Sequence, residues 1–154
     1  MNNMNNVNDM NYVNTAAPAA PAVKLTTSRG LLKLILLSII TLGIYEIWFL
    51  YSVKRDLNTV AGTHNGNRTM GLILLIILSC ITFGIAPIVW FHKISNRIGR
   101  EQVYRGIPQT ISAASFWGWA VIGSIITIGP LVYMYKMCHS MNSICAHYNM
   151  YGTH

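Results

Sequence analysis

The sequence predicts an all-α integral membrane protein with three transmembrane helices and a disordered N-terminal tail. Hydrophobic residues make up 53% of the 154 residues and charged residues only 10%, against about 25% charged residues in ordinary globular domains. Three long runs carry almost no charge: 34–52 contains only Glu46, and 71–91 and 111–135 contain none. A helix of about 20 apolar residues crosses the hydrocarbon core of a bilayer.

The chain divides into an N-terminal tail, residues 1–29, and a membrane domain, residues 30–154. Seven of the first fourteen residues are Asn, and an Ala/Pro-rich stretch follows at 16–22. Such compositions bury little apolar surface and are typical of disordered segments. Because no basic residue precedes Lys24, we expect no secretory signal peptide and assign targeting to the first span.

Aromatic and helix-breaking residues mark the ends and the middle of the expected helices. Trp48 and Tyr51 close the first run, and Trp117 and Trp119 open the third, as in an interfacial aromatic belt. Pro87 predicts a kink in the second run because it lacks a backbone donor. The three spans are expected at about 31–51, 70–91 and 113–135.

One short phrase, Ser-x-x-Thr-x-Gly, recurs inside each apolar run. Small residues let membrane helices approach closely, and Ser and Thr hydroxyls bond back to helix carbonyls and bend helices. We therefore interpret the phrase as a helix-packing repeat near the middle of the bilayer, with a pore or substrate path at broken helices as the alternative. Its positions are Ser38, Thr41, Gly43, Ser79, Thr82, Gly84, Ser124, Thr127 and Gly129.

The first copy carries a family resemblance. The stretch 36–45, followed by Trp48 and by Asp56-Leu57-Asn58, resembles the bacterial membrane family catalogued as domain of unknown function 4234. The resemblance covers 29–58 well and 71–97 more loosely. The family usually has a small residue and an extra aromatic residue at the positions of Glu46 and Ile47. The resemblance implies a small multi-span membrane protein, and it brings no activity and no catalytic residue.

Glu46 is the only carboxylate within an expected span. An ionised carboxylate at that depth is costly unless it is protonated, paired or in contact with water. Alignment of the repeats places Lys136 four residues nearer the surface, about 6 Å. We therefore expect a Glu46–Lys136 pair if the first and third spans touch, with a carboxyl group reached by interfacial water as the alternative.

Four sulfur-containing residues follow one another at helical spacing near the C-terminus: Met134, Cys138, Met141 and Cys145. Soft sulfur ligands suit copper(I), but a straight stripe spreads its ends over about 16 Å. Because only two adjacent residues could then share an ion, we interpret the stripe as packing. Cys138 and Cys145 remain weak metal candidates, and no cofactor is predicted.

No nucleophile motif, phosphate-binding loop or pair of carboxylates is present, so we expect no enzyme. The expected function is that of a membrane protein acting by helix association, as an oligomer or an accessory subunit. The alternative is a small ion or solute conductor formed on oligomerisation. Partners are then the lipid bilayer and a second copy or another membrane protein. The formal charge of +7 is interpreted as span anchoring and not as nucleic-acid binding.

The distribution of Lys and Arg sets the expected topology. With three spans, seven basic residues lie on the side of the tail and four on the other side. Lys and Arg are enriched on the cytoplasmic side. We therefore expect a multi-pass protein of the cell membrane, with the N-terminus in the cytoplasm and the C-terminus outside.

Overall fold

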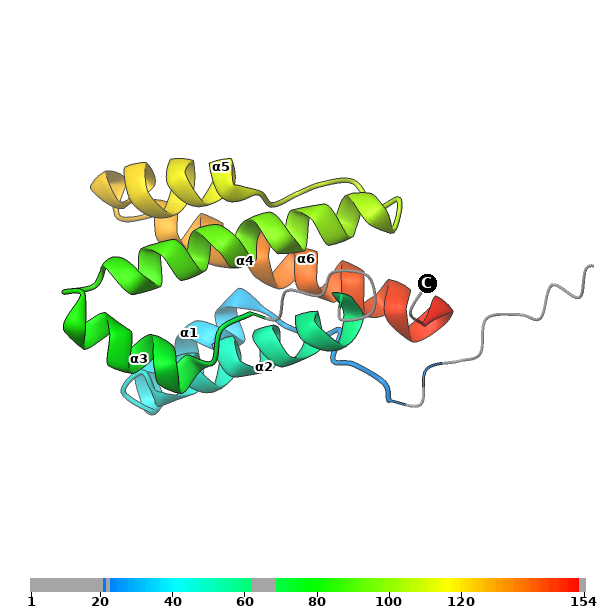
Figure 1. Ribbon diagram of the computed structural model, residues 1–154, viewed down its shortest axis with the longest axis horizontal. Helices are drawn as coiled ribbons and strands as arrows, with labels where there is room; N and C mark the ends of the chain where they lie inside the picture. Colours follow the sequence, from blue (N-terminus) through cyan, green and yellow to red (C-terminus); the bar gives the residue numbers. More distant parts are fainter. Residues whose placement is uncertain (1–20, 22, 62–68, 153–154) are drawn as a thin grey trace, which may run out of the picture.

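The computed structural model describes residues 21, 23–61 and 69–152, and their secondary structure is helical (Figure 1). A π-helical segment, η1, and a 3₁₀ segment, η2, follow the short α5. The elements are α1 Leu31–Ile40, α2 Ile44–Ala61, α3 Leu72–Ile81, α4 Ile85–Tyr104, α5 Ala113–Ser115, η1 Phe116–Val121, η2 Ile122–Ile126 and α6 Gly129–Tyr151.

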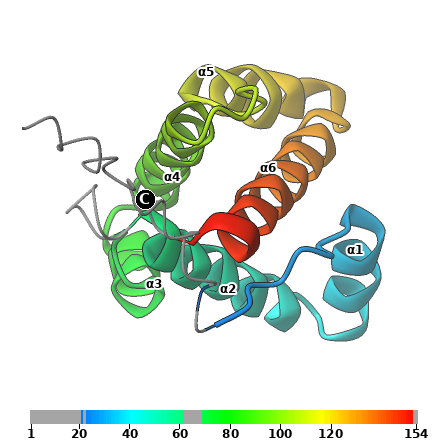
Figure 2. The same ribbon diagram turned by 90° about the vertical axis from the view of Figure 1, so that its right-hand side faces the viewer.

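These elements form three helical hairpins. The first is α1–α2, the second is α3–α4, and the third pairs α5, η1 and η2 with α6. All three turns lie at the same end of the molecule, on the left in Figure 1. In the end-on view of Figure 2, the long arms α2, α4 and α6 adjoin one another, and the short arms lie outside them.

The hydrophobic core lies where the three long arms meet, away from the turns. Its most deeply buried members come from the second half of α2, the middle of α4 and the middle of α6. Fully buried examples are Val53, Leu57, Val60, Ile94, Ile98, Met137, Met141 and Ile144. The hydrophobic core therefore lies at one end of the molecule, which we call the packed end, and the three hairpin turns lie at the opposite end, which we call the turn end.

The prediction of three transmembrane helices is wrong. Each expected span, 31–51, 70–91 and 113–135, is interrupted at its repeat, where the chain reverses direction. The first arms α1 and α3 have only ten residues each. Across the described residues, no helix combines the length and the apolar character needed to cross a membrane. The physical reason is that the repeat ends one helix and starts another, as described below.

The end of the expected tail is ordered against α6. The Leu25 N–H donates to Asn149 Oδ1 at 2.7 Å, and Asn149 Nδ2 donates to the Leu25 carbonyl at 2.8 Å. Asn142 makes the same two bonds with Arg29, at 3.0 and 2.8 Å. Residues 23–29 therefore differ from the disorder expected for 1–29, of which 1–20 and 22 lie outside the described residues.

These contacts also place the two ends of the described chain close together. Residue 25 lies directly against residue 149, so the described N-terminal stretch and the end of α6 are at the same end of the molecule. The expected assignment of the two chain ends to opposite sides of a membrane followed from three spans, which the described residues do not form.

Buried ion pairs hold the packed end together. Arg105 donates from Nε to Glu101 Oε1 at 2.7 Å, and both side chains are at most 1% exposed. The same guanidinium donates to the carbonyls of Val60 at 3.3 Å and Gly152 at 3.2 Å. Arg105 thereby joins the ends of α4, α2 and α6. Breaking such a pair leaves an uncompensated buried charge, which is strongly destabilising.

Candidate functional site

The repeat builds a tight turn around its threonine. The Thr41 hydroxyl donates to the Leu37 carbonyl at 2.7 Å and accepts from the Tyr45 N–H at 2.9 Å. Thr82 makes the equivalent bonds at 2.7 and 3.0 Å. A single hydroxyl therefore binds the last turn of one helix and caps the first turn of the next, the role in which threonine stabilises helix N-termini.

The glycine of the repeat completes the reversal. Gly43 and Gly84 have φ values of +90° and +89°, a conformation that favours glycine. Their N–H groups donate to the carbonyls of Ser38 at 2.7 Å and Ser79 at 3.0 Å, as in the Schellman closure of a helix. A Cβ at either glycine would meet nothing within 4 Å. These two glycines therefore shape turns and do not mark the expected helix crossings.

The third copy uses the same residue types differently. Here Thr127 has the positive φ, 65°, and the Ser124 hydroxyl donates to the Ala120 carbonyl. Pro130 lies in the first turn of α6, a position where its missing N–H costs nothing. A Cβ on Gly123 would lie 2.8 Å from the Gly129 Cα, so close backbone packing occurs in this copy.

Large apolar side chains occupy the points of the turns. Leu42 is 94% exposed and Phe83 is 98% exposed. Both have left-handed backbone, with φ of 51° and 49°, which is unfavourable for bulky residues and is tolerated by Asn and Gly. In water, neither the exposed side chain nor the left-handed backbone of these two residues stabilises the fold. The sequence therefore places two large apolar groups at the turns, outside the core.

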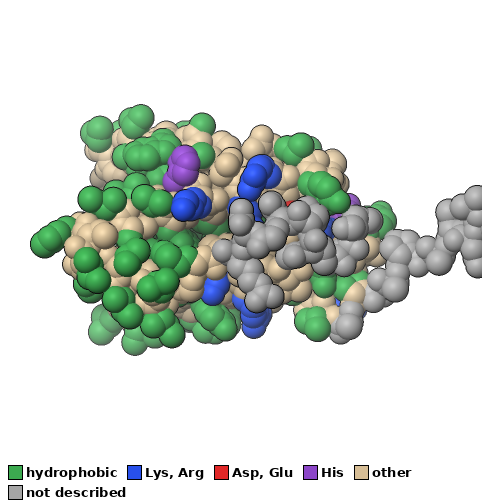
Figure 3. All heavy atoms as spheres, viewed as in Figure 1, with side chains coloured by type: hydrophobic (Ala, Val, Ile, Leu, Met, Phe, Trp, Pro, Cys, Tyr) green, Lys and Arg blue, Asp and Glu red, His purple; other side chains and the backbone are tan. Residues whose placement is uncertain are grey.

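Exposed apolar residues surround these points, and on the face shown in Figure 3 they gather at the turn end, on the left. Patches of this extent are exceptional on soluble monomers and mark interaction surfaces. Glu46 is exposed in the first turn of α2. It is the one charged residue in the described segments 34–52, 71–91 and 111–135, which contain the three turns. Prominent members are Ile39, Ile40, Leu42, Ile44, Ile81, Phe83, Ile85, Ile122, Ile125, Ile126 and Ile128.

Four lysines, Lys33, Lys54, Lys93 and Lys136, form what we call the basic collar. Lys54 follows the turn glycine of its hairpin by eleven residues, Lys93 by nine and Lys136 by seven. At the rise of an α-helix these separations are about 16, 14 and 10 Å. In Figure 3, Lys and Arg side chains accordingly appear around the middle of the molecule, beyond the apolar turn end.

Aromatic residues lie between the turn end and the basic collar. Trp48, Tyr51 and Tyr135 are each about half exposed, as are Trp117 and Trp119 at the start of the third hairpin. Four of these five, all but Tyr135, are the residues for which the sequence predicts an interfacial belt. Trp117 also donates from Nε1 to His92 Nδ1 at 3.0 Å, which joins the third hairpin to the second.

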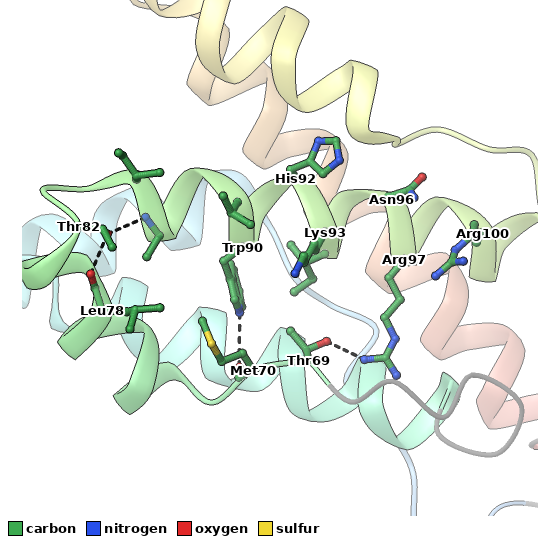
Figure 4. Close-up of a pocket in the computed structure, with 14 residues that line it drawn as sticks. Thr69, Met70, Leu78, Thr82, Trp90, His92, Lys93, Asn96, Arg97 and Arg100 are labelled. Atoms are coloured by element: carbon green, nitrogen blue, oxygen red, sulfur yellow. Dashed lines mark hydrogen bonds between the residues drawn. The ribbon is translucent and has the colours of Figure 1, made fainter.

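A pocket of about 740 Å³ lies between α3 and α4 (Figure 4). Its half nearer the turn is lined by apolar residues, among them Leu78, Ile85 and Val89. Its other half is lined by polar and basic residues, among them Lys93, Arg97 and Arg100. The pocket is therefore apolar at one end and cationic at the other.

Arg97 is the buried member of the cationic half, at 6% exposure. Its Nη1 donates to Asn58 Oδ1 at 2.5 Å and to Thr69 Oγ1 at 2.6 Å (Figure 4). Its Nε and Nη2 are buried without a hydrogen-bond partner among the described residues. Burial lowers the pKa of Arg97, Glu101 opposes this effect and Arg100 adds to it, but a guanidinium remains protonated in proteins.

Arg97 was not among the residues singled out from the sequence. The spacing of Lys93, Arg97 and Arg100 places three cations on one face of a helix, and that spacing is visible in the sequence. The spacing does not show that the middle residue, Arg97, is buried. Only the packing of α4 against α3 and α2 reveals it.

The expected Glu46–Lys136 pair does not form between these two described residues. Lys136 Nζ donates to the Thr110 carbonyl at 3.4 Å, while Glu46 is exposed in the first turn of α2. There its charge interacts favourably with the N-terminal end of the helix dipole. Because the first span is a hairpin, Glu46 lies near a turn and not beside the middle of α6.

The sulfur stripe of α6 lies in the core. Cys138 and Cys145 are 2% and 0% exposed, and Met141 is fully buried. Burial raises the pKa of the Cys138 thiol to about 11, an effect that Arg29 opposes. Among the described residues, no group of three or more His, Cys, Asp or Glu side chains is arranged to hold a metal. Cys138, Met141 and Cys145 are thus members of the hydrophobic core, and Met134 packs against it.

Residues 29–100 match the model of the family described as Domain of unknown function (DUF4234). This match confirms the resemblance inferred from the first two repeats, and it includes both hairpins whose turns are closed by threonine and glycine. It leaves out the third hairpin, whose turn differs. No curated protein and no solved structure matches the chain.

Proposed function

We propose that the protein is a non-enzymatic, monotopic membrane protein, which inserts the turn end of its three hairpins into one leaflet of a bilayer. The observation that carries the proposal is the exposure of Leu42 and Phe83 in strained, left-handed backbone. Moving such a side chain from water to an apolar medium contributes about 1.5–3 kcal/mol. That gain offsets a backbone strain of order 1–3 kcal/mol, whereas in water nothing does.

The dimensions of the hairpins support insertion into a single leaflet. Half of the hydrocarbon core is about 15 Å thick, and three of the four collar lysines, Lys54, Lys93 and Lys136, follow the repeat glycines by about 10 to 16 Å of helix. Insertion to the basic collar therefore places the lysines among the lipid headgroups. The exposed tryptophans and tyrosines then lie at the interface, where these residues are enriched.

The hydrogen bonds of the turns also support insertion. Inside hydrocarbon each unsatisfied backbone group costs several kcal/mol, so irregular backbone is poorly tolerated there. In the first turn, the N–H groups of Gly43, Ile44 and Tyr45 donate to the Ser38 carbonyl, the Thr41 carbonyl and the Thr41 hydroxyl, respectively. The repeat thus reverses the chain while pairing backbone groups that a bilayer would leave unpaired.

Charge favours an anionic leaflet. The basic collar carries four lysines, and a Lys or Arg near an anionic membrane surface contributes about 1 kcal/mol. The cytoplasmic leaflet has such a surface, so we place the protein there, with the N-terminus in the cytoplasm. The proposal includes association with a second copy or with a membrane-protein partner, and its alternative is a conductor formed on oligomerisation.

Cysteine accessibility in vesicles tests the insertion. Cys80 of α3 is exposed and lies two residues before Thr82, whereas Cys138 and Cys145 are buried. In reconstituted vesicles, a membrane-impermeant maleimide should leave Cys80 unmodified until the protein is unfolded in detergent. Cysteines introduced as Val103→Cys and Met150→Cys, at the packed end, should react from the outside.

Two results would contradict the proposal. The first is rapid modification of Cys80 in intact vesicles, because an inserted turn end excludes the reagent. The second is a difference between the two introduced cysteines, in which one of the variants Val103→Cys and Met150→Cys reacts in intact vesicles and the other reacts only after the vesicles are lysed. That pattern would place the two positions on opposite sides of the bilayer.

A further inference from the structure

The face of α4 that lines the α3–α4 pocket changes character along its length. Ile85, Val89, Lys93 and Arg97 follow one another at intervals of four residues and line the pocket together. The two apolar residues lie nearer the turn, and the two basic ones lie nearer the packed end. From Ile85 to Arg97 the helix rises about 18 Å. This gradient runs in the same direction as that of a lipid leaflet, from hydrocarbon to headgroup.

The free atoms of Arg97 define the chemistry of the cationic half. Nε and Nη2 lie on the same edge of the guanidinium, where their N–H bonds are parallel, and both are buried without a partner among the described residues. This edge matches two oxygens of one phosphate group, the bidentate arrangement for which arginine is suited. Nη1, which Asn58 and Thr69 hold, fixes the orientation of the plane.

The surrounding charges favour an anion of net negative charge. Lys93 and Arg100 are exposed and line the pocket on either side of Arg97, and none of its described lining residues is acidic. Glu101, the carboxylate that acts on Arg97, is bound to Arg105 at 2.7 Å. A zwitterionic headgroup would bring its own positive charge close to Lys93, Arg97 and Arg100, and these like charges would repel it. An anionic headgroup is therefore preferred.

We propose that the α3–α4 pocket binds an anionic phospholipid of the same leaflet, with its phosphate group on the free edge of Arg97 and an acyl chain along Val89 and Ile85. The proposal rests on the proposed function, because the inserted hairpins bring the pocket to the bilayer. Lys93 and Arg100 add charge attraction at the headgroup. The pocket thereby selects the lipid that contacts the second hairpin.

Lipid retention in detergent tests the proposal. The whole protein, purified in a mild non-ionic detergent, is titrated with phosphatidylglycerol or with phosphatidylcholine of the same chains, and bound lipid is counted by native mass spectrometry. The variants are Arg97→Gln and the double variant Lys93→Gln/Arg100→Gln, whose two side chains are exposed. The control is Arg55→Gln, which removes an arginine outside the pocket whose side chain is 60% exposed.

We expect the native protein and Arg55→Gln to prefer phosphatidylglycerol at least tenfold, and both pocket variants to lose this preference. An equal preference in all four proteins would overturn the proposal. The double variant keeps the test decisive if Arg97→Gln does not fold. In a further arm, millimolar inorganic phosphate or glycerol phosphate should leave the bound lipid in place. Displacement of the lipid would show that the site binds free phosphate, which would overturn the choice of lipid.

The two proposals fail separately. If Cys80 is modified freely in vesicles while the pocket variants still lose their lipid preference, the insertion is wrong and the pocket stands. If Cys80 is protected while all variants retain phosphatidylglycerol equally, the insertion stands and the pocket assignment is wrong.

Discussion

Replacing Phe83 with asparagine separates membrane binding from folding. The Phe83 ring is 98% exposed, so its removal takes almost no packing from the fold. Asparagine tolerates the left-handed backbone that Phe83 adopts, with φ of 49°. In water the variant should therefore be as stable as the native protein or more stable, because the strain at this position is lowered.

Membrane binding should change in the opposite direction. Transfer of a Phe side chain to an apolar medium contributes about 1.5–3 kcal/mol, and each 1.4 kcal/mol is tenfold in affinity. Phe83→Asn should therefore weaken vesicle binding about 10- to 100-fold. Leu42 lies in a different hairpin, so Leu42→Asn should add a comparable factor, as independent sites do.

The assay is flotation of diluted protein with vesicles at increasing lipid concentration, together with thermal unfolding followed by circular dichroism. Val103→Asn is the matched control, because Val103 is a large apolar residue that is 60% exposed at the other end of α4. It should bind vesicles like the native protein. The reasoning is refuted if Phe83→Asn binds within twofold of native, or if Val103→Asn weakens binding equally.

Three further predictions concern the fold. Thr82→Ala removes the hydroxyl that accepts a hydrogen bond from the first turn of α4 and should lower the free energy of unfolding by about 1 kcal/mol. Gly84→Ala should also lower it, because alanine is strained at the φ of +89° that Gly84 adopts. Chemical denaturation measures both changes, and no loss of stability in either variant would contradict the turn motif. Asn149→Ala releases both bonds to Leu25 and should expose residues 23–29 to limited proteolysis, while an unchanged digestion pattern would show that the clamp is dispensable. Burial raises the pKa of the Cys138 thiol from 9.0 to about 11, so between these pH values the thiol stays protonated in the folded protein and loses its proton in the unfolded chain. The free energy of unfolding should therefore fall as the pH rises from about 9 to 11. Cys138→Ser should flatten that decline.

The sequence predicts the positions of the apolar segments but not their reversal. Apolar length and helical periodicity are the same whether twenty residues run straight or fold back after ten. The distinguishing signal was the pair Thr-x-Gly, a capping residue followed by a residue suited to left-handed backbone. Leu42 and Phe83 concealed it, because turns are ordinarily recognised by polar neighbours. The large apolar side chains that made the turns hard to recognise in the sequence are the same ones that suggest membrane insertion.

Other parts of the candidate site depend on tertiary packing. The basic residues and the aromatic belt were visible as a pattern around the apolar runs. The burial of Arg97 was not, because Asn58 and Thr69, which hold its Nη1, come from other segments. The same is true of Asn142 and its bonds to residue 29, which join segments 113 residues apart.

Glu46 provides a test of the insertion that works in the opposite direction from Phe83. It follows the turn glycine Gly43 by three residues, about 4.5 Å of helix, whereas the collar residue Lys54 follows it by eleven. Insertion to the basic collar therefore carries the Glu46 carboxylate well into the hydrocarbon. A charged side chain at the bilayer centre costs about 2.5–3.5 kcal/mol on insertion scales, and less toward the interface.

Glu46→Gln removes this charge and should strengthen binding to neutral phosphatidylcholine vesicles by about tenfold or more, up to about 100-fold. Neutral vesicles are required because the substitution also raises the net charge, which would by itself increase binding to anionic lipid. Glu46→Asp keeps the charge and should bind like the native protein. If Glu46→Gln and Glu46→Asp bind equally, Glu46 stays outside the hydrocarbon and the first hairpin is not inserted. A gain in Glu46→Gln combined with a loss in Phe83→Asn places both turns in the leaflet, since no single change in overall charge or fold stability produces both.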